Sequence, residues 1–340
     1  MSGEAGRPSR RTFRFHGMLP GHRTGPGAGA SARLCQPHRP HPHGHSCVHV
    51  FLGGDCDLGT LRRMSTVPPP LDAADPCLVD CYDDVPLWSA PFGLALLEFV
   101  RLRRGLNALD IGCGTGFPLV EMAMRLGPSS RLAGIDPWRP ALARARRKLG
   151  VWGTGPVALA EGVAEALPFP DASFDLVFSN NGFNNVADPV RALAECARVS
   201  RPGGQLVFTF NLPESMRELY APLLAILRAR GDIGAPSRVA VHVAARRQPV
   251  ESWRRMLDDA GFRIDEVSLR SFTLRFADAA ALFAHGFMRL AFASSWHELV
   301  AVDEREAVFA ELRSHLDAAR HPRGGIMLTI PFACVDATRV

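Results

Sequence analysis

Residues 109–116, Leu-Asp-Ile-Gly-Cys-Gly-Thr-Gly, are the stretch that decides the fold of this chain. The residues up to Ile111 have the pattern of a short buried strand, and glycines follow at positions 112, 114 and 116. Glycines at alternate positions let the backbone turn tightly and lie against a ligand with no Cβ in the way. Phe117-Pro118 then opens a helix, whose free N–H groups and positive dipole end face the turn. The stretch therefore predicts a cofactor cradle at the carboxyl end of a parallel strand.

The spacing of these glycines narrows the choice of ligand. A dinucleotide fingerprint has the pattern G-x-G-x-x-G and would need a glycine at position 117, where this chain has Phe117. A phosphate-binding P-loop would need Gly-Lys-Ser or Gly-Lys-Thr, which the sequence lacks. We therefore expect a ligand without a pyrophosphate group.

Strand and helix patterns alternate after this turn. Parallel neighbours need a crossover connection, so five strands that alternate with helices predict a doubly wound α/β sheet. The predicted strands are 108–111, 131–135, 157–160, 175–179 and 205–210, the last after a turn at 201–204, and the helices between them are 118–126, 140–149 and 189–199.

The second half of the chain has a different pattern. Two further strands are predicted there, and we place them side by side and antiparallel at the edge of the sheet. The helices of this half are expected to form a cap over the ligand crevice. The predicted strands are 263–269 and 326–335, and the helices are 213–230, 249–260, 278–293 and 303–319, with one more at 92–103 before the sheet.

Charge and composition divide the chain unevenly. Residues 1–66 contain nine arginines and three acidic residues, whereas the remainder contains 30 basic and 31 acidic residues, so the net charge of +5 belongs to the leader. We expect residues 1–66 to be a disordered leader rich in Arg, Pro and His, or an extension before a start at Met64, although its His tract is also typical of metal binding. The remaining predicted domains are an N-terminal helical segment at 67–104, a binding core at 105–212 and a cap with the last two strands at 213–340.

Several function classes are disfavoured by composition. The body lacks the basic surface of a nucleic-acid-binding protein, and no run of 18 apolar residues predicts a membrane span. The eight cysteines follow no zinc or disulfide spacing, which favours free thiols in a cytoplasmic protein and no metal site. The oligomeric state is left open.

Four motifs together carry a family resemblance: LDIGCGTG, GIDP, EGVAEALPFPDASFDLVFSNN and RPGGQLVFT. In this order and spacing they resemble the class I S-adenosylmethionine-dependent methyltransferases, in the type 11 group that includes ubiquinone and menaquinone methyltransferases. The resemblance covers roughly residues 105–212. It implies a Rossmann-like seven-stranded sheet with an antiparallel last strand, and methyl transfer from S-adenosylmethionine to a small organic acceptor through an O, C or N nucleophile.

The resemblance also implies cofactor-binding residues. Asp110, Gly112, Cys113, Gly114 and Gly116 would surround the methionine part and the ribose. Asp136, followed by Pro137, lies about 20 residues past the glycines, where an acid accepts hydrogen bonds from ribose hydroxyls; an N-cap role is compatible with this. The family often has an acid at the position of Val163, so backbone at Ala164 or the carboxylate of Glu165 would replace its adenine contact, unless Glu165 is only a helix-end charge.

Acceptor-side candidates follow the fourth strand. Asn180 and Asn181 are expected at the sulfonium end of the cofactor, and Asn184 and Asn185 are expected to orient a polar substrate, although asparagine is also a common turn residue. The segment lacks the Asn/Asp-Pro-Pro-Tyr/Phe pattern of enzymes that methylate adenine or glutamine amides. This absence disfavours DNA and protein amides as acceptors.

Aromatic and histidine side chains complete the candidate list. Tyr82 and Trp88 precede the core, where they would attract the sulfonium or pack against the sheet. His242, His285 and His297 are the candidates for a general base in the cap, although no catalytic residue is assigned. Two other functions stay open: a catalytically idle S-adenosylmethionine-binding regulator, and an NAD-type oxidoreductase.

Overall fold

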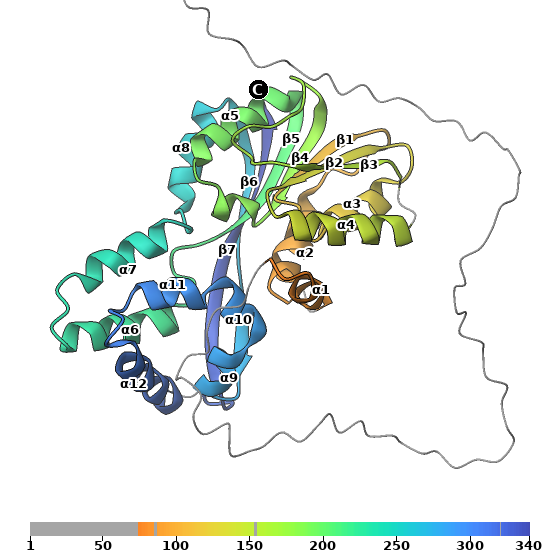
Figure 1. Cartoon of the computed structure of the whole chain (residues 1–340). Helices are drawn as coiled ribbons and strands as arrows, with labels where there is room; N and C mark the ends of the chain where they lie inside the picture. Colours follow the sequence, from red (N-terminus) through yellow and green to blue (C-terminus); the bar gives the residue numbers. More distant parts are fainter. Residues whose placement is uncertain (1–73, 85–86, 153–154, 320) are drawn as a thin grey trace, which may run out of the picture. The chain divides into compact units, whose positions relative to one another are not determined.

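The computed structural model describes residues 74–84, 87–152, 155–319 and 321–340, and these form a seven-stranded sheet flanked by helices (Figure 1). The strand order is β3-β2-β1-β4-β5-β7-β6. Strands β1 to β5 are parallel, and β7 is antiparallel to both of its neighbours, as the sequence predicted. The strands are β1 Asn107–Ile111, β2 Arg131–Asp136, β3 Val157–Glu161, β4 Phe174–Asn180, β5 Ser200–Asn211, β6 Phe262–Phe276 and β7 Ile326–Arg339.

Helices cover both faces of the sheet. Successive side chains of a strand point to opposite faces, so a strand that is buried on both sides has a continuous apolar run. In β4, Leu176 and Phe178 pack with the helices of one face, and Val177 between them packs with the helices of the other. The first face carries α2 Ser89–Phe99, α3 Leu119–Leu126 and α4 Arg139–Trp152, and the second carries α5 Pro189–Val199 and α8 Val250–Asp259.

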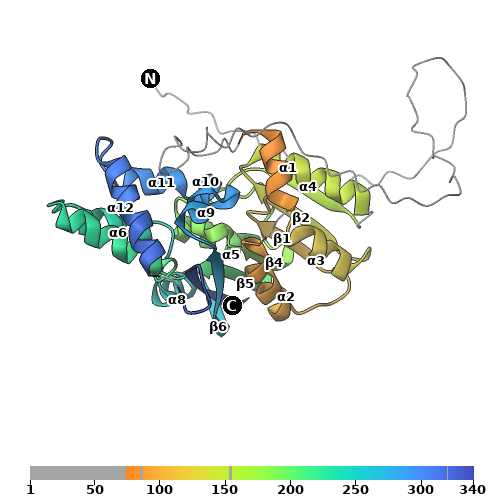
Figure 2. The same cartoon turned by 90° about the horizontal axis from the view of Figure 1, so that it is seen from below.

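The cap is built on a two-stranded extension of the sheet. The pairing of β5 with β7 ends at Asn211 and Phe332, whereas β6 and β7 stay paired as far as Phe276 and Ile326. Figures 1 and 2 show the cap helices gathered around this extension, away from α3 and α4. The helices are α6 Arg217–Ala229, α7 Ala235–Ala244, α9 Ala279–Ala284, α10 Gly286–Ala291, α11 Ala293–Glu298 and α12 Arg305–Ala318, and α1 Pro76–Asp84 precedes the sheet.

The cap differs from the sequence prediction in two respects. The single helix predicted at 278–293 is wrong, because His285 has an extended backbone (φ −62°, ψ 126°) that separates α9 from α10. Helix α7 was not predicted. Both differences lie in helices whose apolar side chains pack against other cap helices, where tertiary contacts override local helix propensity.

Strand lengths also differ from the prediction. Strands β6 and β7 extend past the predicted 263–269 and 326–335, because each continues through the paired extension. The turn predicted at 201–204 lies inside β5, as an irregularity where the register with β4 shifts. Gly203 supplies the positive φ of 75° that this irregularity needs.

Some expectations fall outside the described residues. The predicted leader at 1–66 is one of them. Among the described cysteines, Cys113, Cys196 and Cys334 are buried free thiols, as expected. No helix within the described ranges combines the length and the apolar character needed to cross a bilayer.

The packing of α8 on the sheet generates a prediction about Trp253. This side chain is buried against Phe183, Phe208 and Phe210, at ring-centroid distances of 5.7, 5.1 and 5.3 Å, and its indole N–H has no hydrogen-bond partner. Trp253→Ala is expected to lower the free energy of unfolding by about 3–5 kcal/mol, because it leaves a cavity. Trp253→Phe removes no hydrogen bond and should cost less than half as much. Urea unfolding followed by circular dichroism measures both; equal losses would contradict this account.

Candidate functional site

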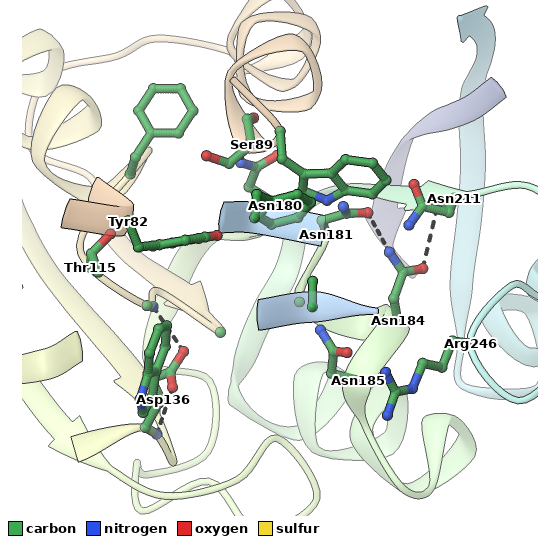
Figure 3. Close-up of a pocket in the computed structure, with 18 of the residues that line it drawn as sticks. Tyr82, Ser89, Thr115, Asp136, Asn180, Asn181, Asn184, Asn185, Asn211 and Arg246 are labelled. Carbon is green, nitrogen blue, oxygen red and sulfur yellow. Dashed lines mark hydrogen bonds between the residues drawn. The ribbon is translucent and has the colours of Figure 1, made fainter. Parts of the chain in front are cut away.

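The carboxyl ends of four parallel strands converge on one cavity of about 280 Å³ (Figure 3). Strands β1 and β4 are neighbours at its centre, where the strand order reverses, and such a switch point is where open α/β sheets bind ligands. The residues that follow β1, β2, β4 and β5 form the floor and sides of the cavity. Residues of α1, α7, α10 and α11 close it from the cap side.

The glycine turn after β1 borders the cavity and approaches other backbone closely. Gly112 has φ +72°, and a Cβ placed on it would lie 2.9 Å from the Cα of Gly182. Gly114 has φ +50° and open space beside it, so its backbone faces the cavity without obstruction. Gly116 (φ +99°) instead packs against Ala145 of α4 and does not line the cavity. Gly112 and Gly114 therefore face the cavity, whereas Gly116 allows close packing of the turn against α4.

Asp136 ends β2 at the edge of this turn. Its Oδ2 accepts the backbone N–H of Gly114 at 2.8 Å, and its Oδ1 accepts that of Trp138 at 2.7 Å. Burial raises the pKa of the carboxyl, and the two backbone N–H groups oppose this shift. The carboxylate lines the cavity, where it is placed to accept hydroxyl hydrogen bonds from a ligand.

Asp110 lies in β1 just before the turn and is fully buried. Neither of its carboxylate oxygens has a hydrogen-bond partner. Burial, followed by the negative charge of Asp136, raises its pKa well above the usual value, and the nearby Leu119 backbone opposes this only in part. A buried carboxyl group without partners is costly. Asp110 is not among the residues that line the cavity, so its predicted role in cofactor binding stays a prediction.

Asparagines fill the opposite side of the cavity, as the sequence indicated. Asn180, the last residue of β4, donates from Nδ2 to the carbonyl of Ser89 at 3.1 Å. Its Oδ1 accepts the hydroxyl of Thr209 at 3.1 Å. These bonds tie β4 to the start of α2 and to β5, so the amide of Asn180 is held in one orientation.

The next asparagines form a chain of amides (Figure 3). Asn181 has a left-handed backbone (φ 65°) and opens the short 3₁₀ helix η2, Gly182–Asn185. The Nδ2 of Asn184 donates to the Oδ1 of Asn181, and the Oδ1 of Asn184 accepts the backbone N–H of Asn211 at 3.2 Å. Asn185 also lines the cavity. The Oδ1 of Asn211 is buried without a partner. Asn211 was not predicted, because its position after β5 shows no motif.

An aromatic wall closes the cavity from the cap side. The ring of Trp88 stacks on Phe287 of α10 at a centroid distance of 5.0 Å and meets Phe292 at 5.3 Å. Tyr82 of α1 stacks on Phe287 at 6.0 Å and meets the edge of Trp138 at 5.9 Å. Burial, with the nearby charges of Asp83 and Asp136, raises the pKa of Tyr82 to about 12, so its hydroxyl keeps its proton.

Ion pairs hold α1, and with it Tyr82, against α4. Asp83 lies 2.8 Å from both Lys148 and Arg144. These bonds outweigh burial and lower the pKa of Asp83. The Asp83 carboxylate borders the cavity but is already neutralised by two cations.

Of the three histidine candidates, His242 alone is among the residues that line the cavity. Its Nε2 lies 2.9 Å from the hydroxyl of Tyr220. That hydroxyl also accepts N–H groups from Arg247 at 3.3 Å and from Trp296 at 3.1 Å. Arginine and tryptophan only donate, so the tyrosine hydrogen is left for Nε2 and the ring proton is placed on Nδ1.

This hydrogen-bond pattern disfavours His242 as a general base. Burial, with the charges of Arg247 and Arg246, lowers its pKa to about 4, so the ring is neutral at pH 7. Its basic nitrogen is occupied by Tyr220, and Nδ1 is a donor. His285 and His297 lie outside the cavity lining, where they pack edge-on against Phe276 and Phe309.

Three further predicted cofactor residues are not among the residues that line the cavity. The Oε1 of Glu165 accepts the backbone N–H groups of Ala187 and Asp188, at 2.7 and 3.1 Å, at the beginning of α5. Neither Glu165 nor its neighbour Ala164 lines the cavity, and Pro137 does not either. Their roles in cofactor binding stay predictions, and the helix-end role considered for Glu165 is the one its contacts match.

Part of the chain is similar to a known family. Residues 109–208 match the family described as "Methyltransferase domain". The demethylmenaquinone methyltransferase of Listeria welshimeri is 39% identical over 110 residues, which are 32% of this chain and 47% of the relative. That of Anoxybacillus flavithermus is 38% identical over 111 residues, 33% of this chain and 47% of the relative. The chain thus spans about half the length of these relatives.

A solved structure has a similar fold. The YcgJ protein of Bacillus subtilis matches with a TM-score of 0.50 and 18% identity, over 74% of this chain and 98% of its own. The family match includes the glycine turn and strands β2 to β4, whereas β6, β7 and the cap lie outside its residues.

The unpartnered carboxylate of Asp110 leads to a prediction about how the stability of the protein depends on pH. Asp110→Asn is expected to raise the free energy of unfolding of the ligand-free protein by about 1–3 kcal/mol at pH 7, since it removes an unpaired buried acid. The wild-type carboxyl has a raised pKa in the folded state. Its destabilising effect is therefore absent below its ordinary pKa of about 3.9 and grows as the pH rises above it.

Urea titrations of both proteins across the pH range measure this effect. The two stabilities should converge in acid and separate as the pH rises. The account is contradicted if the difference in free energy of unfolding does not depend on pH, or if the variant is less stable at pH 7. Either result would show that another group already stabilises the Asp110 carboxylate.

Proposed function

We propose that this protein transfers the methyl group of S-adenosylmethionine to a small organic acceptor. The observation that carries the proposal is the match of residues 109–208 to the methyltransferase family, with the glycine turn and Asp136 at one cavity. An NAD-type oxidoreductase is disfavoured, because the turn has Phe117 where a dinucleotide fingerprint needs glycine.

The residues at the cavity fit the proposed cofactor. Gly112 and Gly114 leave backbone exposed to a ligand. Asp136 would hold the ribose hydroxyls. Asp110 has two buried oxygens without partners, which suit the amino group of the methionine part, directly or through water. The aromatic rings of Tyr82 and Trp88 would face a positively charged sulfonium favourably.

The chemistry that the bound cofactor supplies is an electrophilic methyl group on sulfur: the sulfur–carbon bond breaks as the acceptor's nucleophile bonds to that carbon, and S-adenosylhomocysteine leaves. The protein's part is to align the two reactants and exclude water. The fixed amide of Asn180 and the aromatic wall would do this. An acceptor that is already ionised, or an amine, needs no strong base, and the neutral, donor-only His242 is consistent with such an acceptor.

The acceptor cannot be taken from the relatives. Their names give demethylmenaquinone as their substrate, but the match covers about half of each relative and little beyond the sheet of this chain. The cap, which supplies Arg246, Arg247 and Phe287 to the cavity, lies outside the residues of the family match.

Calorimetric titration with S-adenosylmethionine, S-adenosylhomocysteine and NADH tests the cofactor. Binding of the first two in the micromolar to low-millimolar range, without NADH binding, is expected. Release of S-adenosylhomocysteine with a panel of phenols, carboxylic acids, amines and quinols then separates an enzyme from an idle binder. No binding of either sulfur compound would refute the proposal.

Asp136 provides a sharper prediction. Asp136→Asn should weaken binding of S-adenosylhomocysteine at least tenfold, because hydrogen bonds to a charged acceptor are worth about 1.5–3 kcal/mol. Calorimetry measures the loss, and circular dichroism checks the fold.

Glu165→Gln is the matched control, since Glu165 lies outside the cavity lining. It should leave the affinity within about twofold. An equal loss in Glu165→Gln would instead support the adenine contact predicted from the sequence.

A further inference from the structure

One cation in the cavity wall has no counter-ion. Arg247 is 5% exposed, and its Nη1 is buried with no hydrogen-bond partner. Its other contacts are with Tyr220: Nη2 donates to the hydroxyl at 3.3 Å, and the guanidinium lies 4.9 Å from the ring centroid. No carboxylate in the described part of the chain forms an ion pair with it. Arg247 is therefore a buried charge with an unused donor at the cavity.

The neighbouring groups cannot neutralise this charge. Arg246 also lines the cavity and adds a second positive charge. His242 is neutral at pH 7, and the bonds described above leave its Nδ1 as a donor. The cavity has two carboxylates, but Asp83 is paired with Lys148 and Arg144, and Asp136 is bound by backbone N–H groups.

A buried charge without a partner costs several kcal/mol, and natural proteins keep such groups where a ligand supplies the opposite charge. Arginine presents a planar fork of donors that matches the oxygens of carboxylates and phosphates. Arg246, Arg247 and Nδ1 of His242, which would receive such an anion, are all hydrogen-bond donors. This end of the cavity therefore has the chemistry of an oxyanion subsite.

The subsite lies away from the residues assigned to the ribose. Figure 3 shows Arg246 on the side opposite Asp136, with Asn181, Asn184 and Asn185 between them. Arg246 and Arg247 immediately follow α7, a cap helix, whereas Asp136 and the glycine turn belong to the sheet. In the same cavity, Phe287 and Phe292 offer apolar ring surface.

We propose that Arg247, assisted by Arg246, binds an oxyanion group of the methyl acceptor, which is a small aromatic compound carrying a carboxylate or a phosphate. The proposal rests on the methyltransferase function proposed above and names its class of acceptor. The anion anchors the acceptor at the cap end of the cavity, and the aromatic wall receives its ring. The nucleophilic atom then points toward the asparagines and the cofactor.

The test compares acids with their neutral counterparts. Calorimetry on the full chain saturated with S-adenosylhomocysteine uses hydroxybenzoate isomers with the matching hydroxybenzamides, and phenyl phosphate with phenol as its neutral counterpart. At least one acid or phosphate is expected to bind tenfold or more tightly than its neutral counterpart. A preference for hydroxybenzoates over phenyl phosphate, or the reverse, identifies the oxyanion. If no acid or phosphate in the panel exceeds its neutral counterpart, the proposal is wrong.

Variants assign the preference to the two arginines. Arg247→Gln should abolish the preference for the acid, and Arg246→Gln should reduce it several-fold. Because Arg246 is exposed, its variant is expected to fold even if Arg247→Gln does not, and it then provides the test. Arg254→Gln, an exposed arginine of α8 outside the cavity, is the charge-matched control and should change nothing. Retention of the full preference in both Arg246 and Arg247 variants would overturn the assignment.

A second readout separates this proposal from the cofactor proposal. Affinity for S-adenosylhomocysteine should stay within about twofold in Arg247→Gln. A tenfold loss of that affinity, with the acid preference intact, would mean that Arg247 binds the carboxylate of the cofactor, which overturns the acceptor subsite. Failure of the wild-type protein to bind S-adenosylhomocysteine refutes the proposed function and is seen before any acid is added.

Discussion

The site depends on the close approach of two backbone segments, the turn after β1 and the turn after β4. A Cβ on Gly112 would lie 2.9 Å from the Cα of Gly182, and a Cβ on Gly182 would lie 2.6 Å from the carbonyl oxygen of Ile111. The hydroxyl of Ser179 donates to that same oxygen at 2.7 Å. Because both contact positions lack side chains, the glycine turn and the asparagine segment meet at one cavity.

The buried polar groups without partners are concentrated around this cavity. Asp110, Asn211 and Arg247 each keep an unused buried polar atom there or directly beside it. Each is expected to destabilise the ligand-free protein. Unpartnered buried polar groups that cluster near a cavity are typical of a site in which stability is given up for ligand binding. Ser200 and Trp253 are further unpartnered groups, and they lie away from it.

The sheet and the cap make different contributions. The sheet supplies Asp136, the glycine turn and the asparagines from strand ends, where the parallel ladder fixes their positions. The cap supplies Phe287 from α10, and Arg246 and Arg247 from the turn that follows α7. The glycine turn, Asp136 and Asn180 thus lie within the residues that match the family, and the cap residues lie outside them.

The sequence by itself determined the sheet, its antiparallel last strand and the residues at its carboxyl ends. This was possible because a buried parallel strand, a glycine turn and an acid at the next strand end are local patterns. Tertiary structure decided which of these residues share a cavity. Asp136 and Asn180 line that cavity, whereas the carboxylate of Glu165 accepts a backbone N–H at the beginning of α5.

Only the tertiary structure identified Arg247. Nothing in the local sequence Ala-Arg-Arg-Gln distinguishes a surface arginine from a buried one. The burial and the missing counter-ion of Arg247 arise from contacts with Tyr220, 27 residues away, and from the packing of the cap. Such contacts depend on how helices meet, which periodicity along the chain does not specify.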